Sequence, residues 1–146
     1  MIYLLDTDSI IFLIRFLKNK RSSANKKAQR LIKRIRTTAE TGSSVGISAI
    51  TRAELEYGAA KSTDPEKERT AVEKILAPFD EFDFDSKMCA SHHGRIRMTL
   101  EKKGESIGAM DLLIAAHALA LNSTLVSNNT GYFERIEDLS VENWTV

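Results

Sequence analysis

The chain has 146 residues, of which 42% are hydrophobic and 28% charged, and its net charge is +1; this composition fits one soluble domain with a single core rather than a disordered or fibrous chain. Its one cysteine excludes an internal disulfide framework and suits a reducing cytosol. No run approaches the roughly 20 apolar residues of a membrane span, and the apolar start is too short for a signal peptide. We therefore expect a cytoplasmic protein with no membrane contact and one domain over residues 1–146.

The first predicted elements are a strand and two helices. Residues 2–5 form a continuous apolar run, which is typical of a buried parallel strand. Asp8 or Ser9 can cap a helix that runs to about Lys18. A polar, basic loop over 19–25 leads into a second helix over 24–40, whose apolar residues recur at helical spacing.

The rest of the chain continues this alternation. Asp64-Pro65 suits the start of a helix, Asp85 is expected to cap a long helix, and the nearly all-apolar segment 108–121 is expected to be the central buried helix. After the second helix we expect a strand over 45–48, helices over 49–60 and 64–77, and an extended piece over 79–84. Two further helices are expected over 85–102 and 108–121. The chain then continues with a strand over 124–127, a one-turn helix near 132 and an edge strand over 139–144.

Strands that alternate with helices predict an α/β fold, in which a short, mainly parallel sheet is covered by helices on both faces. Functional sites in such sheets form at the carboxyl ends of the strands. Polar residues that directly follow strands are therefore the first candidates for a site.

Five polar residues fall at this edge. Asp6 follows the first strand, Glu54 lies just inside the helix after the second, Asp111 lies in the first turn of the apolar helix, and Asn128 and Asn129 follow the 124–127 strand. The topology predicts that they meet, although they are far apart in sequence.

Each acid also has a purely structural interpretation. Asp6 can cap a turn, Glu54 can complete a Thr-x-x-Glu capping box with Thr51, and Asp111 can favour the positive end of its helix. Taken together, carboxylates so close to a core are costly unless they are paired or bound to a cation. Hard oxygen ligands, with no histidine or cysteine at zinc-ligand spacing, indicate Mg²⁺ or Mn²⁺. Such a site activates water and neutralises charge on a phosphate, which predicts a metal-dependent ribonuclease.

Four segments resemble the PIN-domain ribonucleases, and among them the VapC toxins of type II toxin–antitoxin pairs. The segments are Leu5-Asp6-Thr7-Asp8, Ser48 to Ala59, Ile107 to Ala118, and Asn128-Asn129 through Arg135. The resemblance covers essentially the whole chain, and it implies a PIN-like three-layer sandwich. It also implies a homodimer and a cognate VapB-type antitoxin that blocks the site.

The resemblance assigns roles position by position. The metal-binding acids of the family match Asp6 and Asp111, its glutamate matches Glu54, and its fourth position, often aspartate, matches Asn129. Asparagine adds no charge, which would lower metal affinity, whereas Asp8 stands where the family often has asparagine. We expect catalytic roles for Asp6, Glu54, Asp111 and Asn129, metal binding by Asp6 and Asp111, and substrate contacts from Asp8 and Asn128. The segments 107–117 and 128–135 resemble those of toxins that cut transfer RNA, which favours transfer RNA as the substrate.

Charge is unevenly distributed along the chain. No acidic residue lies between Ser9 and Ala39, whereas ten basic residues do: Arg15, Lys18, Lys20, Arg21, Lys26, Lys27, Arg30, Lys33, Arg34 and Arg36. We expect Lys26, Arg30 and Lys33 to track the RNA backbone. A solvated helix face, or an interface with a second copy or with the antitoxin, is the alternative.

Two other functions compete with this interpretation. The chain can be a non-catalytic RNA-binding module in which the acids only cap helices. The Asp6-Thr7-Asp8 opening also fits haloacid-dehalogenase-type phosphatases, although that class needs an acidic pair after a late strand, where this chain has Ser127-Asn128-Asn129.

Overall fold

The computed structural model describes residues 1–19 and 25–146. Its sheet has the strand order β3-β2-β1-β4-β5, and every neighbouring pair is parallel. The strands are β1 (Ile2–Leu5), β2 (Ser44–Ser48), β3 (Asp80–Phe82), β4 (Thr124–Val126) and β5 (Ser140–Glu142). The predicted α/β class with a parallel sheet is confirmed.

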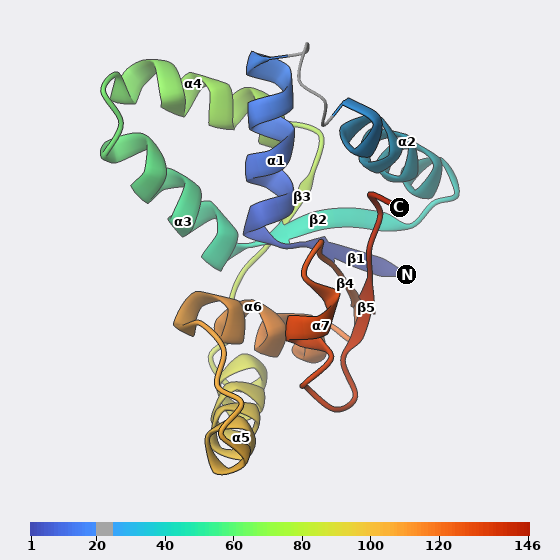
Figure 1. Cartoon of the computed structure of the whole chain (residues 1–146), viewed down its shortest axis with the longest axis vertical. Coiled ribbons are helices and arrows are strands. Elements are labelled where there is room, and N and C mark those ends of the chain that lie inside the picture. The colour runs from blue at the N-terminus through green and yellow to red at the C-terminus, as the bar shows by residue number, and fades with distance from the viewer. Residues whose placement is uncertain (20–24) are drawn as a thin grey trace.

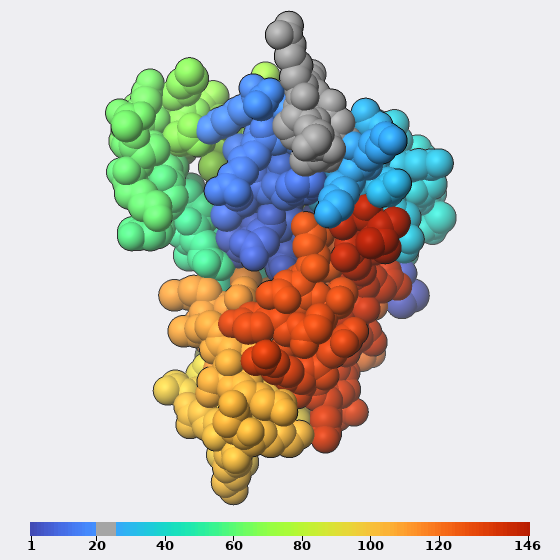
Figure 2. Space-filling view, viewed as in Figure 1, coloured from blue at the N-terminus to red at the C-terminus, as the bar shows by residue number. Residues whose placement is uncertain are grey.

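Helices cover both faces of the sheet (Figure 1). They are α1 (Thr7–Lys18), α2 (Asn25–Glu40), α3 (Ala49–Ala60), α4 (Pro65–Leu76), α5 (Met88–Lys103), α6 (Ala109–Ala120) and α7 (Thr130–Phe133). Helices α1 to α4 occupy the upper part of the view and α5 to α7 the lower part, and Figure 2 shows the same division in the colours of the packed surface. This arrangement is the expected three-layer sandwich.

The strands alternate side chains between two cores, because successive residues of a strand point to opposite faces. Leu5 and Val126 pack with residues of α1 and α4, whereas Leu4 and Leu125 pack with residues of α5, α6 and α7. Gly46 in β2 allows β3 to approach, since a Cβ there would lie 2.4 Å from the carbonyl oxygen of Asp80.

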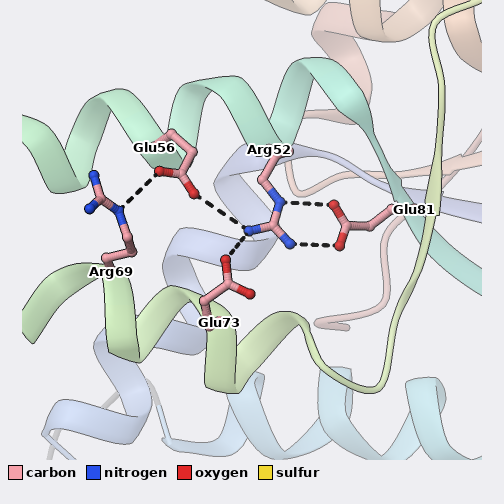
Figure 3. A network of polar contacts seen from close by, with 5 residues as sticks. All are labelled: Arg52, Glu56, Arg69, Glu73 and Glu81. Atoms are coloured by element: carbon pink, nitrogen blue, oxygen red, sulfur yellow. Dashed lines mark hydrogen bonds and ion pairs between the residues drawn. The ribbon is translucent and has the colours of Figure 1, made fainter. Parts of the chain in front are cut away.

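An ion-pair network joins α3, α4 and β3 (Figure 3). The guanidinium of Arg52 on α3 makes two hydrogen bonds to Glu81 of β3, at 2.8 and 2.6 Å, and also pairs with Glu73 of α4. Glu56 lies 3.5 Å from Arg52 and 3.4 Å from Arg69. The network therefore fixes the helix that carries Glu54 against its neighbours.

Two expected helix starts are wrong. The cap of α1 is Asp6 rather than Asp8 or Ser9, because its carboxylate accepts the Ser9 amide at 2.9 Å. Helix α5 begins at Met88. The carboxylate of Asp85 accepts the main-chain amides of Lys87 and Met88, and these bonds form a turn before the helix. Asp64 caps α4 as expected. Most of the predicted 19–25 loop, including Lys20 and Arg21, lies outside the described residues. Within the described ranges, no helix combines the length and apolarity needed to cross a membrane.

Candidate active site

Asp6 directly follows the carboxyl end of β1 and lies in the interior. Its side chain is 2% exposed, and its amide donates to the carbonyl of Val126 in β4 at 3.0 Å. Burial raises the pKa of the Asp6 carboxyl, while hydrogen bonds from Ser127 and Ser9 act in the opposite direction. Asp6 does cap a helix, but capping leaves it a buried carboxylate with no cation beside it among the residues described.

Glu54 comes to the same edge on α3. Ser48 caps this helix, accepting the amide of Ile50 at 3.0 Å. The capping-box interpretation of Glu54 is therefore wrong, because Thr51 is a buried helical residue and not the cap. Instead the hydroxyl of Thr7 donates to Glu54 Oε1 at 2.7 Å and lies 3.0 Å from the Thr51 hydroxyl.

Asp111 lies in the first turn of α6, after the cap residue Gly108. The pKa of its carboxyl is raised to about 6, first by burial and then by the negative charges of Asp6, Asp8 and Glu54. Four acids from three helices and one strand end are thus within electrostatic range of each other. This convergence is the one that the strand-end rule predicted.

The end of β4 adds two asparagines to this edge. The main-chain amide of Asn129 donates to the hydroxyl of Ser127 at 2.9 Å, and the Ser127 side chain in turn makes a hydrogen bond with Asp6. Asn129 precedes α7, and its side chain makes no capping hydrogen bond. Asn128 and Asn129 are both exposed, so their side-chain amides are accessible to solvent at this edge of the sheet.

The donor set fits a hard divalent cation. Within residues 1–19 and 25–146, no three acidic, histidine or cysteine side chains form a ready-made cage for a metal. Mg²⁺ does not need one, because it keeps several waters and takes one or two carboxylates. Asp6 and Asp111 are the two whose pKa values are raised by burial, and a bound cation would reverse the cost of ionising them.

The basic residues of α2 lie on a different element from the acids. Helix α2 packs on β2 and α1, and Figure 1 shows it on the side of α1 away from α3. Arg30 donates to the carbonyl of Thr145 at 3.3 Å, and Arg34 lies over the ring of Trp144 and 3.4 Å from Glu142. Lys26 and Lys33 are exposed on this helix.

Hydroxyl side chains are the part of the site that the sequence-based reasoning missed. Thr7 orients Glu54, and Ser127 links Asn129 to Asp6. Each lies one or two residues from a predicted acid or amide, and this adjacency is the signal that could have identified them. Cys89 is fully buried, and burial raises the pKa of its thiol, so it is no nucleophile.

Comparison with known proteins agrees with this geometry. The family model described as the PIN domain matches residues 3–139. The ribonuclease VapC2 of Rickettsia felis is 39% identical over 144 residues, which cover 99% of this chain and 98% of the relative. The tRNA(fMet)-specific endonuclease VapC of Shigella flexneri is 36% identical over 143 residues, 98% of each chain.

A solved structure is similar over the same length. In the crystal structure of VapBC2 from Rickettsia felis bound to a DNA fragment from their promoter, one chain superposes with a TM-score of 0.83 at 37% identity, covering 99% of both chains. Fold and site define a PIN-domain nuclease, a class that generally depends on divalent metal ions. The chain belongs to the VapC family of PIN-domain endoribonucleases, the toxins of type II toxin–antitoxin systems. The phosphatase alternative is thereby excluded.

Proposed function

We propose that this chain, acting as one PIN domain over residues 1–146, hydrolyses phosphodiester bonds in RNA with Mg²⁺ held by Asp6 and Asp111. The observation that carries the proposal is the pKa of Asp111, which is raised to about 6 by burial and then by the charges of Asp6, Asp8 and Glu54. Mutual repulsion of this kind disfavours the ionised acids until a cation joins them. Mn²⁺ suits the same oxygen donors.

The remaining residues of the edge have separate roles in this proposal. A bound Mg²⁺ lowers the pKa of water and neutralises charge on the phosphate. Glu54, fixed by the Thr7 hydroxyl at 2.7 Å, orients the attacking water. The exposed amides of Asn128 and Asn129 contact the phosphate or sugar of the RNA, and Asp8 supplies negative charge beside the cation.

The substrate class and partners follow from the relatives. The Shigella flexneri relative is named for action on tRNA(fMet), which favours transfer RNA as the substrate here. The neighbouring structure holds VapBC, which supports a cognate VapB-type antitoxin; the homodimer stays a prediction from the resemblance. A toxin that acts on transfer RNA works in the cytoplasm, so the proposal places this protein there.

Cleavage of purified transfer RNA tests the proposal. Asp6→Asn and Asp111→Asn keep the side-chain shape, and asparagine still caps a helix, so both variants should fold. We expect wild-type protein to cleave only with Mg²⁺ or Mn²⁺ present, and both variants to fall to background. Asp138→Asn is the matched control, because Asp138 is exposed and has a positive φ of 67° that asparagine also adopts.

The outcomes separate the competing functions. Loss of cleavage in both variants, with the control unaffected, supports the metal-dependent nuclease. If wild-type protein binds RNA but never cleaves it, the chain is a non-catalytic RNA-binding module. If either variant retains full Mg²⁺-dependent cleavage, the assignment of its carboxylate as a ligand is wrong.

A further inference from the structure

The start of α6 places Asp111 where a helix would ordinarily use it. Gly108 is the cap residue, so Asp111 is the third helical residue after it. An acidic side chain at this position commonly reaches back to the amide of the cap residue, as in a capping box. A carboxylate turned back onto that amide would be drawn out of the orientation in which it faces a metal ion.

Tyr132 of α7, and not Asp111, is the hydrogen-bond acceptor of that amide. Its hydroxyl accepts the hydrogen bond from the Gly108 amide. A Cβ built on Gly108 would lie 3.3 Å from the Tyr132 hydroxyl and 3.6 Å from Asp111 Oδ2. The phenol and the carboxylate therefore border the same backbone position from different elements.

The ring of Tyr132 is held in place from two sides. It meets Phe133 edge-to-face, with centroids 5.6 Å apart at 78°, and the guanidinium of Arg135 lies 5.5 Å from its centroid. Arg135 also donates to the carbonyls of Glu105 and Ser106 at 3.4 and 3.5 Å. These contacts join α7 to the loop before α6, so the position of the hydroxyl does not depend on its bond to Gly108 alone.

We propose that Tyr132 is a positioning residue for the metal site. Because its hydroxyl accepts the hydrogen bond of the Gly108 amide, the Asp111 carboxylate stays out of a capping box and available to a divalent cation. This inference rests on the proposed function, in which Asp111 is a ligand. Removing the hydroxyl leaves the amide without its partner, and the Asp111 carboxylate, whose Oδ2 would lie 3.6 Å from a Cβ on Gly108, is an acceptor beside it. The fold then loses little, and the metal site loses a ligand.

A purely structural role for Tyr132 predicts a different result. If the hydroxyl only anchored α7 to α6, its removal would lower the melting temperature and leave metal affinity unchanged. Metal affinity and metal-free stability therefore distinguish the two roles.

The test is Tyr132→Phe, which keeps the ring and its contacts with Phe133 and Arg135. Mg²⁺ binding is measured by calorimetry without RNA, together with the melting temperature of the metal-free protein. We expect binding to weaken by about 10- to 100-fold, the same range as the loss of a group that orients a metal ligand, and the melting temperature to change by no more than about 2 °C. Tyr3→Phe is the matched control, since the Tyr3 hydroxyl contacts only Met1 Sδ, at 3.9 Å, among the described residues.

A second measurement follows the Gly108 amide itself by NMR in the metal-free protein. We expect Asp111→Asn to leave this resonance nearly unchanged in the wild-type background and to shift it in the Tyr132→Phe background, where Asp111 has become its acceptor. Tyr132→Phe protein that binds Mg²⁺ as tightly as wild type overturns the inference. If Asp111→Asn alone leaves Mg²⁺ binding intact, the proposed function fails as well, so the two failures are distinguishable.

Discussion

Acidic side chains gather in two regions of this molecule, and the first has cations built into it. On α3, α4 and β3, Glu56, Glu73 and Glu81 surround Arg52, and Arg69 adds a second positive charge (Figure 3). Hydrogen bonds donated by Arg52 lower the pKa of the Glu81 carboxyl, and the same bonds to Glu81 and Glu73 raise the pKa of the Arg52 guanidinium. Each of these three carboxylates therefore has a positive partner within the protein.

The second region, at the carboxyl edge of the sheet, differs in this respect. No salt bridge joins Asp6, Asp8, Glu54 or Asp111 to a basic side chain within the described ranges, and the pKa values of Asp6 and Asp111 rise. The direction of the pKa shift therefore separates acids that stabilise the fold from acids placed to bind a cation.

The largest expected effect sharpens this comparison on a single helix. Glu54→Gln should lower kcat for RNA cleavage by roughly 10²-fold, the scale of a positioned acid–base group. Glu56→Gln, two residues along the same helix but in the Arg52 network, should leave kcat unchanged. Steady-state cleavage at saturating Mg²⁺ measures both. Equal kcat values for the two variants would remove the functional distinction between these glutamates.

Breaking the network should affect stability and not chemistry. Arg52→Ala leaves three acids without their shared cation, so we expect the free energy of unfolding to fall by about 1–2 kcal/mol, somewhat more than one exposed pair contributes. Arg52→Lys should recover only part of this, because lysine lacks the fork that binds Glu81 twice. Urea unfolding measures the change. An Arg52→Ala protein that is as stable as wild type but inactive would contradict this account.

Neutralising one acid in each region should change stability in opposite directions. The pKa of Asp111 is raised when folded, so the folded protein binds the proton more tightly and ionisation at pH 7 destabilises it. Asp111→Asn should therefore stabilise metal-free protein by about 1 kcal/mol, allowing for solvent screening. The pKa of Glu81 is lowered, so its contribution exists above pH 4.5 and is lost in acid, and Glu81→Gln should destabilise at pH 7. Melting temperatures of both variants at pH 7 and pH 4 check the signs.

The smallest effect concerns α2, where Lys26 and Lys33 are exposed. If they track RNA, Lys26→Ala or Lys33→Ala should lower the salt dependence of RNA affinity by roughly one unit. Affinities across a salt series, in an Asp111→Asn background that cannot cleave, give this slope. Arg30→Ala is less specific, because Arg30 also bonds to Thr145. An unchanged slope with weaker antitoxin binding would assign α2 to an interface.

Much of the fold was predictable because its signals are local. Apolar runs marked the strands, Asp64-Pro65 marked the start of α4 and the all-apolar segment marked α6. The gathering of Asp6, Glu54 and Asp111 followed from a general rule about parallel sheets.

What sequence reasoning missed depends on contacts between distant residues. The hydroxyl of Thr7 reaches Glu54 across 47 positions, and Arg52 meets Glu81 across 29. Neither pairing leaves a periodic pattern in the sequence. The prediction of the α1 cap was wrong for a related reason. Asp6, Asp8 and Ser9 are all good capping residues, and only the hydrogen bond from the Ser9 amide to the Asp6 carboxylate decides among them.

Mg²⁺ binding to metal-free protein at two pH values tests the central claim most directly. The pKa of about 6 at Asp111 means that its carboxyl is ionised at pH 7.5 and mostly protonated at pH 5, and only the ionised form binds a metal. Calorimetry should therefore show binding at pH 7.5 that weakens by about tenfold or more at pH 5, and that is lost in Asp111→Asn at both pH values. Equal affinity at the two pH values, or Asp111→Asn protein that binds Mg²⁺ like wild type, would contradict the assignment of this edge as the metal site.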